Sequence, residues 1–482
     1  MIRILGLGPG HVHDLTRRAW DTLARAETVY LRTSRHPAVP DLPENPTYHS
    51  FDELYEREDD FESVYKTITA QILDAARSGD VVYAVPGDPT VGESTTWRIK
   101  EAAALAGIGV EIISGVSFIE PMLALAGIDG MDNLQVLDAL TVATMHHPPI
   151  NPDGPALLGQ IYNQHVASDV KLTLMNQYPD DFEVKLIHAA GTDSVQVETL
   201  PLYEIDRSDH IQHMTALYLP ILGEMSSFEQ FQEIIAHLRA PEGCPWDRKQ
   251  THESLRPFLL EEAYEVLEAI DQGDTDALYE ELGDLLLQIV LHTQIAIDEG
   301  EFYMADVLRH VNKKMIERHP HVWGDVNVED SDQVITNWDA IKKQEKAEKG
   351  TARESYLDGI PPGLPALLHA HKYQVKAAKV GFDWDELGDV AAKVREEMDE
   401  IQEAETQQER FEEIGDLFFV LVNWARWLGV DDPESALRET NAKFYRRFRY
   451  IESQVAAGER PIEDYSLEEL DAYWNAAKTE GL

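Results

Sequence analysis

Apolar runs alternate with helical periodicity through the first 222 residues. Short, mostly apolar runs occupy residues 2–7, 80–85 and 110–113, and helical spacing appears at 15–26 and at about 95–106. Each apolar run ends in a turn rich in Gly, Pro or Ser. This rhythm is typical of an α/β domain with a largely parallel sheet, in which ligands bind at the carboxyl ends of the strands. We therefore expect a ligand site where the three turns lie.

A second α/β lobe is predicted over about residues 129–222. Its candidate strands are 171–175, 184–188 and 217–222, separated by Pro- and Gly-rich turns. His146 and His147 fall among these turn signals, and we interpret them as loop residues rather than metal ligands. The first part of the chain should thus be a two-lobed domain at 1–222, with lobes at about 1–128 and 129–222.

The pattern changes after residue 225, where long helical periodicities dominate. Two acidic motifs recur there, each an E-E-x-x-E followed by an E-x-x-D and preceded by a Trp-Asp pair. We interpret them as a duplicated all-α module, with a first repeat at 226–350 and a second at 360–482. The Lys- and Glu-rich segment 339–351 is either a solvated helix or a linker. The fold class predicted is therefore multidomain, α/β followed by all-α.

Composition narrows the range of partners. The chain of 482 residues carries a formal net charge of −47. Such a surface repels long nucleic acids and anionic membranes, so a small anion would bind only through divalent cations or a local basic pocket. Cys244 is the single cysteine, which excludes an intrachain disulfide and favours a reducing compartment. Without a signal-peptide pattern or an apolar span, the expected location is the cytoplasm.

The acidic motifs carry the candidate chemistry. Carboxylates three residues apart project from one helix face, and a short connection would make the two helices of each motif antiparallel neighbours. Four acids would then converge in each repeat. They are Glu262, Glu265, Glu281 and Asp284 in the first copy, and Glu397, Glu400, Glu413 and Asp416 in the second.

Two interpretations of these acids compete. One is a solvated acidic face, the usual place for charged residues. The other is a cluster inside a helical bundle, favoured by the apolar sequence around Asp284 and Asp416 and by the recurrence of the motif. Buried carboxylates need compensating cations. Carboxylates without His or Cys select Mg²⁺ or Mn²⁺, and such ions support hydrolysis of phosphoanhydrides.

Further motifs strengthen this picture through a family resemblance. Together with GCPWD at 243–247, RHPHV at 318–322 and KVGFDW at 379–384, the acidic motifs resemble the MazG family of nucleoside triphosphate pyrophosphohydrolases. The resemblance covers nearly all of residues 226–480. It implies an all-α fold, a homodimer formed through the helical region, Mg²⁺, and cleavage of nucleoside triphosphates to monophosphates and pyrophosphate.

The same resemblance assigns nucleotide contacts. Lys443 and Arg447, within the segment 441–448, would face phosphates, and Trp474 with Lys478 would lie near the base or sugar. The alternative is an ordinary basic amphipathic helix end. Because these residues belong to the second repeat, we expect the second carboxylate set to be the better catalyst. Turnover by the first copy stays open, since its acids are intact.

Three turns of the N-terminal half form a second resemblance. GLGPGH at 6–11, PGDP at 86–89 and SGVSF at 114–118 could each be a tight turn needing glycine. In this order, after strands, they resemble the tetrapyrrole methylase family over about residues 1–222. That resemblance implies S-adenosylmethionine bound between the lobes, and no methyl acceptor can be assigned. The implied cofactor contacts are Gly87, Asp88, Val91, Ser117 and Phe118, with Met175 added from the predicted strand 171–175.

Three functions are compatible with these patterns. The leading hypothesis is a fusion of a methylase-like domain with a nucleoside triphosphate pyrophosphohydrolase. A second makes S-adenosylmethionine-dependent methyl transfer the main activity, with the helical half as dimeriser or accessory. A third is a non-catalytic nucleotide sensor that uses the metal site for binding alone.

Overall fold

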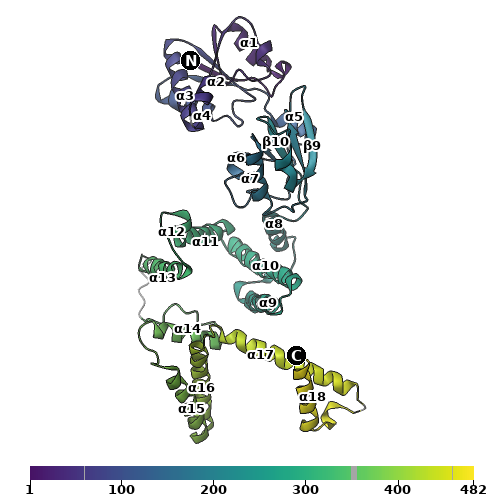
Figure 1. The fold of residues 1–482 in the computed structure, drawn as a ribbon, viewed down its shortest axis with the longest axis vertical. Helices are drawn as coiled ribbons and strands as arrows, with labels where there is room; N and C mark the ends of the chain where they lie inside the picture. The colour runs from purple at the N-terminus through teal and green to yellow at the C-terminus, as the bar shows by residue number, and fades with distance from the viewer. Residues whose placement is uncertain (59, 349–354, 459) are drawn as a thin grey trace. The chain divides into compact units, whose positions relative to one another are not determined.

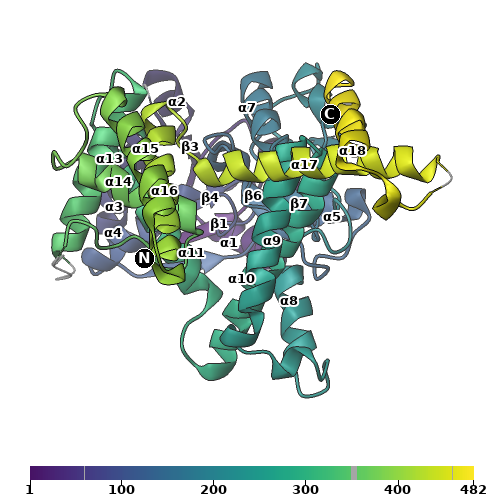
Figure 2. The same cartoon turned by 90° about the horizontal axis from the view of Figure 1, so that it is seen from below.

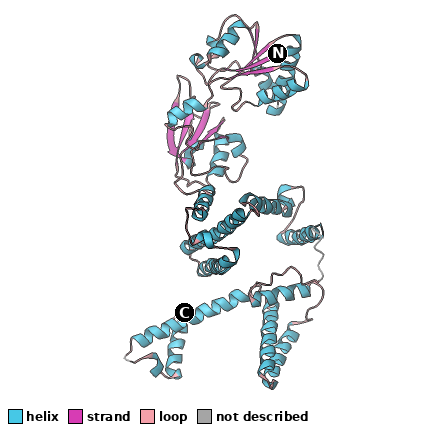
Figure 3. Ribbon diagram, turned by 180° about the vertical axis from the view of Figure 1, so that it is seen from behind, coloured by secondary structure: helices cyan, strands magenta, loops and turns pink. Residues whose placement is uncertain are grey.

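The computed structural model describes residues 1–58, 60–348, 355–458 and 460–482. It divides into two units, Met1–Lys249 and Gln250–Leu482, which are described separately. Strands occur in unit 1, whereas the elements of unit 2 are helical (Figures 1 and 3). The predicted order, α/β followed by all-α, is confirmed. Within the described ranges, the chain has no helix with the length and apolar character that a membrane crossing requires.

The first lobe of unit 1 is a parallel sheet covered by helices on both faces. Its five strands follow the order β3-β2-β4-β1-β5, and all four pairings are parallel. The strands are β1 Ile2–Gly6, β2 Thr28–Leu31, β3 Thr47–Ser50, β4 Val81–Val85 and β5 Val110–Ile113. The helices are α1 Arg17–Arg25, α2 Asp52–Arg57, α3 Phe61–Ser78, α4 Ser94–Leu105 and α5 Ile119–Ala126. The prediction of a largely parallel sheet is confirmed here.

Alternation along the strands explains this layering. Ile4 and Tyr83 pack with Ile68 of α3 and Ile99 of α4 in one apolar cluster. The alternate residues of the same strands, among them Leu5 and Ala84, point to the other face and pack around Leu23 of α1 in a second cluster. Because successive side chains point to opposite faces, β1 and β4 are apolar on both faces and lie inside the sheet.

The second lobe is a mixed sheet with the order β6-β7-β10-β8-β9. Among the described strands of this second sheet, β6 and β7 pair in parallel and the other three pairs are antiparallel. The strands are β6 Gln135–Asp138, β7 Ala156–Gly159, β8 Glu183–His188, β9 Gln196–Pro201 and β10 Thr215–Leu219. The helices of this lobe are α6 Ala139–Val142 and α7 Gln164–Leu174. Met122 of α5 packs against β7, β8 and β10, so α5 covers one face of this second sheet.

One predicted strand of this lobe is wrong. Residues 171–174 are the last turn of α7, and Met175 is its C-cap. The helix begins after Asn163, whose side chain accepts a hydrogen bond from Val166 N. Its buried residues include Val170 and Leu174, four apart on one face. A window of five residues was too short to distinguish this periodicity from a strand.

Helix α8 Phe228–Arg239 follows the second lobe, and unit 1 ends ten residues later at Lys249. Asp153 of the second lobe accepts hydrogen bonds from the backbone and hydroxyl groups of Ser226 and Ser227, just before this helix. This contact ties the beginning of α8 to the second lobe. The short 3₁₀ helices of the chain are η1 Val12–Asp14, η2 Val39–Asp41, η3 Leu202–Arg207, η4 Asp247–Lys249 and η5 Ile462–Asp464.

Unit 2 consists of helices, of which two pairs form antiparallel hairpins. Its first five helices are α9 His252–Gln272, α10 Thr275–Glu299, α11 Met304–Arg318, α12 Pro320–Trp323 and α13 Ser331–Glu348. The others are α14 Ala366–Ala378, α15 Leu387–Glu403, α16 Gln407–Trp427, α17 Pro433–Ala456 and α18 Leu467–Thr479. Of the segment 339–351, residues up to Glu348 are helical and the rest lie outside the described residues.

Short connections close the hairpins α9–α10 and α15–α16, as expected. Gly273 ends α9 with φ of 66°, a left-handed conformation that glycine adopts without a Cβ penalty. Thr406 begins α16 with a capping box to Glu409. The paired helices lie side by side in both views (Figures 1 and 2).

Candidate functional site

The second acidic motif brings three of its four carboxylates together. Oxygens of Glu397 on α15 and of Glu413 and Asp416 on α16 lie within 4.8 Å of one another. Glu397 is 4% exposed, whereas Asp416 is exposed. The spacing of three residues on α16 and the antiparallel pairing of the helices produce this convergence, as the sequence predicts.

A lysine supplies positive charge to this cluster. Lys393 Nζ lies 2.9 Å from an oxygen of Glu397, 2.7 Å from Glu396 and 3.9 Å from Glu400. Hydrogen bonds to Glu396 and Glu397 raise the pKa of Lys393, so it stays protonated at neutral pH. Burial raises the pKa of Glu400, Lys393 opposes this shift, and Glu397 and Glu413 add to it. A buried carboxylate is tolerable here because a cation already compensates it.

The first acidic motif forms a comparable cluster. Oxygens of Glu262, Glu265 and Glu281 lie within 4.8 Å of one another. Burial and then repulsion by Asp284 and the other acids raise the pKa of Glu262. Burial and repulsion raise the pKa of Glu281 in the same way. Asp284, the fourth predicted acid, is not part of this group of three, although its charge acts on Glu262 and Glu281.

The two copies of the motif differ in whether a basic side chain lies beside the acids. The position corresponding to Lys393 in the first copy is Phe258. In the part of the chain that the structure describes, no ion pair with Lys or Arg engages the four acids of the first copy. Protonation or a bound cation would relieve the repulsion that raises the pKa of Glu262 and Glu281.

The expected dry interior of a helical bundle is wrong for the single chain. Leu282 and Leu286, beside Asp284, are 50% and 38% exposed. Phe418, beside Asp416, is 56% exposed. An apolar run in the sequence indicates a helix face that packs against another apolar surface. It does not indicate whether that other surface belongs to the same chain or to a partner molecule. Each hairpin here keeps one apolar face uncovered.

The predicted nucleotide-contacting residues lie on α17 and α18. The Arg447 guanidinium lies over the Trp474 ring at 5.4 Å from its centroid, and Arg447 Nε donates to the backbone oxygen of Leu482 at 2.7 Å. Lys443 lies one helical turn before Arg447, on the same face. Lys478 is exposed on α18 and contacts Asn475 Oδ1 at 3.4 Å. The structure thus brings Arg447 and Trp474 into contact. Lys443 lies on the same helix as Arg447, and Lys478 lies on the same helix as Trp474.

Unit 1 has a cavity between its two sheets, in the region where a ligand site is expected. A cavity of about 860 Å³ is lined by residues of both lobes, including Gly87, Val91 and Phe118 among the predicted cofactor contacts. The glycine turns meet beside it. Gly8 and Gly87 exchange backbone hydrogen bonds of 3.2 and 2.8 Å, and a Cβ on Gly6 would lie 2.2 Å from the Gly87 carbonyl oxygen. Only glycine allows so close an approach of the strand ends.

Two other predicted contacts brace these turns. Asp88 accepts hydrogen bonds from Thr90 and from the backbone N–H of Gly115. The Ser117 hydroxyl donates to Glu120. Neither Asp88 nor Ser117 lines the cavity. Met175 is 39% exposed at the end of α7 and does not line it either, because the strand assumed for it is a helix.

Sequence reasoning missed a polar network in the cavity wall. Arg32 forms an ion pair with the buried Glu93 and donates to the hydroxyl groups of Tyr55 and Tyr65. Burial raises the pKa of the nearby Tyr162 to about 12. The available signal was the β-branched and aromatic run before Arg32, which forms β2 and places Arg32 at a carboxyl strand end.

The fold and the two kinds of site divide the protein into two functional parts. An α/β unit with a ligand cavity between two sheets precedes a helical unit with two carboxylate clusters. The donor set of each cluster fits a hard divalent cation, because every candidate ligand atom is a carboxylate oxygen. The cavity fits a small molecule of cofactor size.

Comparisons with known proteins identify both parts. A family model described as the MazG nucleotide pyrophosphohydrolase domain matches residues 250–323, and one described as tetrapyrrole (corrin/porphyrin) methylases matches residues 1–206. The uncharacterized protein YabN of Bacillus subtilis is 44% identical over 99% of this chain and 98% of that protein.

Characterised names come from shorter relatives. The nucleoside triphosphate pyrophosphohydrolase/pyrophosphatase MazG of Thermotoga maritima is 47% identical, over 52% of this chain and 95% of its own length. The nucleoside triphosphate pyrophosphohydrolase of Escherichia coli K12 is 45% identical, over 53% of this chain and 98% of its own length. The chain belongs to the MazG family through its helical region and carries a tetrapyrrole methylase domain before it.

Proposed function

We propose that the helical unit hydrolyses nucleoside triphosphates to nucleoside monophosphates and pyrophosphate, using Mg²⁺ or Mn²⁺. The observation that carries the proposal is the convergence of Glu397, Glu413 and Asp416 from two helices, with Glu397 buried. The names of the relatives from Thermotoga maritima and Escherichia coli support the same substrate class. The first copy offers a second, less buried cluster.

The residues divide the work as follows. Glu397, Glu400, Glu413 and Asp416 would hold the divalent cations. When bound, such ions neutralise phosphate charge and make a water molecule a better nucleophile. Lys393 keeps the acids together before the ions arrive. Lys443 and Arg447 would hold phosphates, and Trp474 and Lys478 would hold the base or sugar, so that the substrate is oriented before reaction.

We expect the working form to be a homodimer. Leu286 on α10 and Phe418 on α16 are large apolar residues exposed in the single chain. A second copy that covers these faces would also remove water from the carboxylate clusters and strengthen their electrostatics. Sedimentation should therefore give twice the mass of the chain, and Leu286→Glu should shift it toward the monomer. A monomeric wild-type protein would contradict this expectation.

Direct product analysis tests the hydrolase. Full-length protein is incubated with ATP or dUTP and Mg²⁺, and monophosphate, pyrophosphate and orthophosphate are separated. Glu397→Gln combined with Glu413→Gln should reduce pyrophosphate release by more than about 100-fold, because two ligands lose their charge. Glu412→Gln is the matched control, since Glu412 is exposed beside Glu413 on the same helix.

Each outcome of this assay has a meaning. Pyrophosphate release that survives in the double variant, but falls in Glu262→Gln with Glu281→Gln, moves the activity to the first copy. Binding of nucleotide without products would leave a sensor. Release of orthophosphate instead of pyrophosphate would contradict cleavage between the α- and β-phosphates.

A second activity is proposed for unit 1. Its cavity and three packed glycine turns favour binding of S-adenosylmethionine, in keeping with the tetrapyrrole methylase family match. Gly87 lies in the cavity wall, where it has no side chain to fill the space, and Val91 and Phe118 add an apolar wall. Calorimetry with S-adenosylmethionine tests this, and Gly87→Val is the variant expected to block it. No heat with the wild-type protein would leave unit 1 as a scaffold.

A further inference from the structure

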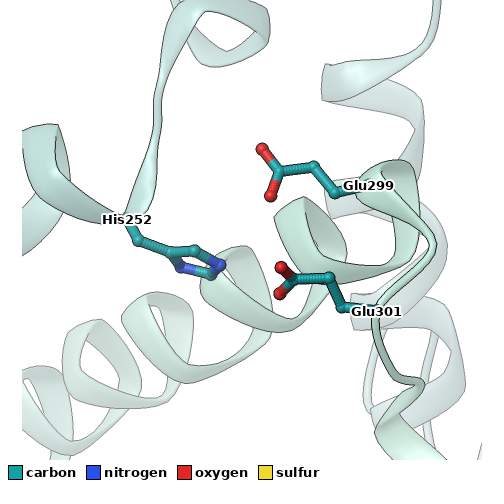
Figure 4. A group of neighbouring side chains, drawn as sticks. All are labelled: His252, Glu299 and Glu301. Atoms are coloured by element: carbon teal, nitrogen blue, oxygen red, sulfur yellow. The ribbon is translucent and has the colours of Figure 1, made fainter.

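A histidine and two glutamates meet at the end of the first hairpin that lies away from its acidic motif. His252 is the first residue of α9, and Glu299 and Glu301 flank the left-handed Gly300 that ends α10. One ring nitrogen of His252 and one oxygen of each carboxylate lie within 4.8 Å of one another. Figure 4 shows the imidazole directed toward both carboxylates. At a rise of about 1.5 Å per residue, Glu262 lies roughly 15 Å further along α9.

The turn after α10 creates this geometry. Gly300 adopts φ of 74°, and the backbone N–H of Glu301 turns back to the carbonyl of Ala296. Glu299 and Glu301 therefore leave the chain on either side of the reversal and point to the same place (Figure 4). Two carboxylates brought together repel each other unless a cation lies between them.

A second histidine orients the first. His252 Nδ1 lies 2.8 Å from His292 Nδ1, and the two rings stack with an interplanar angle of 8°. One of these nitrogens must donate and the other must accept. Nε2 of His252 is the ring atom left to face the carboxylates, and its lone pair is available to a metal ion when His252 Nδ1 donates and His292 Nδ1 accepts. Within the described part of the chain, no hydrogen bond or ion pair joins His252 to Glu299 or Glu301.

We infer that His252, Glu299 and Glu301 form a binding site for a divalent transition-metal ion, with Zn²⁺ as the representative ion. An imidazole beside carboxylates favours Zn²⁺ and its neighbours over Mg²⁺ and Ca²⁺, which prefer oxygen alone. Zinc bonds of about 2.0–2.2 Å require the three atoms to approach to about 3.3 Å, a movement that exposed glutamate side chains can make. Three protein ligands leave at least one position for water.

The site has its own role, apart from the proposed hydrolysis. It would clamp the beginning of α9 to the turn after α10 and so fasten the open end of the hairpin. His292 acts as a positioning residue, because its hydrogen bond fixes the ring plane and tautomer of His252. Partners of this kind typically change metal affinity by about 10- to 100-fold when they are removed.

Zn²⁺ titration of the full-length protein tests the inference. Calorimetry in a large excess of Mg²⁺ keeps the carboxylate clusters occupied, and Co²⁺ absorption reports an imidazole ligand. Wild-type protein should show a Zn²⁺-binding event that is lost in His252→Gln and in Glu299→Gln with Glu301→Gln. His292→Gln should weaken it by about 10- to 100-fold. Asp298→Asn, a neighbouring acid on α10 outside the cluster, is the matched control and should bind as the wild type does.

Two further measurements separate the possible failures. Circular dichroism establishes that each variant is folded, and pyrophosphate release in Mg²⁺ alone should be unchanged in His252→Gln. Zinc binding that persists in both ligand variants, or that falls equally in Asp298→Asn, would overturn the site. Failure of the hydrolase assay with intact zinc binding would refute the proposed function and leave this site in place.

Discussion

Replacing His36 with glutamine should remove an acid-sensitive element from unit 1. His36 is 6% exposed, with Nε2 3.0 Å from the carbonyl oxygen of Gly8, while Ala38 N–H donates to Nδ1 at 3.3 Å. The neutral ring satisfies both contacts, with Nε2 donating and Nδ1 accepting. A second proton on Nδ1 would face the N–H of Ala38. Burial lowers the pKa of His36 to about 4, although the Gly8 carbonyl acts in the opposite direction.

The magnitude follows from the difference in pKa between the folded and unfolded states. A change from 6.5 to about 4, at about 1.36 kcal/mol per pKa unit, gives about 3 kcal/mol. Because the unfolded ring takes up its proton first, the contribution of His36 is present in full above pH 6.5. It is lost as the pH falls from 6.5 toward 4. Glutamine can donate to Gly8 and accept from Ala38 without titrating.

Hydrogen exchange in the full-length protein measures the pH dependence of stability for unit 1 alone. Peptides from β1 and β4 report the local opening free energy, after correction for the intrinsic pH dependence of exchange. The wild type should lose up to about 3 kcal/mol more than His36→Gln between neutral pH and pH 4. Equal pH dependence in both proteins, or a His36 pKa near 6.5 by NMR, would refute the reasoning.

Three further predictions concern the glycine turns, the second carboxylate cluster and the predicted nucleotide contact Arg447. Gly115→Ala should destabilise unit 1 by about 1–3 kcal/mol, since the new Cβ would lie 2.4 Å from the Gly87 carbonyl oxygen; an unchanged unfolding midpoint in urea would contradict this. Lys393→Met should make the melting temperature more sensitive to Mg²⁺, because Glu397 loses its cation; equal shifts in variant and wild type would count against it. Arg447→Lys should raise KM about tenfold, because lysine cannot reproduce the stacked, hydrogen-bonded guanidinium; an unchanged KM would remove this residue from nucleotide binding.

Local patterns in the sequence predicted what depends on local geometry. The strand–turn–helix rhythm led to the parallel sheet and its glycine turns, and the spacing of three residues led to the convergence of Glu413 and Asp416 with Glu397. The strand assigned at 171–175 failed because the window was shorter than two helical turns. Where the residues lie on one helix or in one hairpin, their spacing in the sequence is sufficient to predict that their side chains lie close together.

Contacts between residues that are far apart in the chain could not be predicted from the sequence. Arg32 meets Glu93 across 61 residues, and His252 meets Glu301 across 49, so no spacing rule connects them. The burial of the acidic motifs was overestimated because apolar neighbours such as Phe418 were assumed to pack within the chain. An apolar helix face is equally suited to a partner molecule.

The position of bound ions tests the central claim most directly. A crystal of the full-length protein, soaked with Mn²⁺ and a non-hydrolysable nucleoside triphosphate, shows the ions by anomalous scattering. We predict peaks at about 2.0–2.3 Å from oxygens of Glu397, Glu413 and Asp416, with the triphosphate completing the coordination. Peaks elsewhere with these carboxylates turned into solvent, in both copies of the motif, would contradict the account.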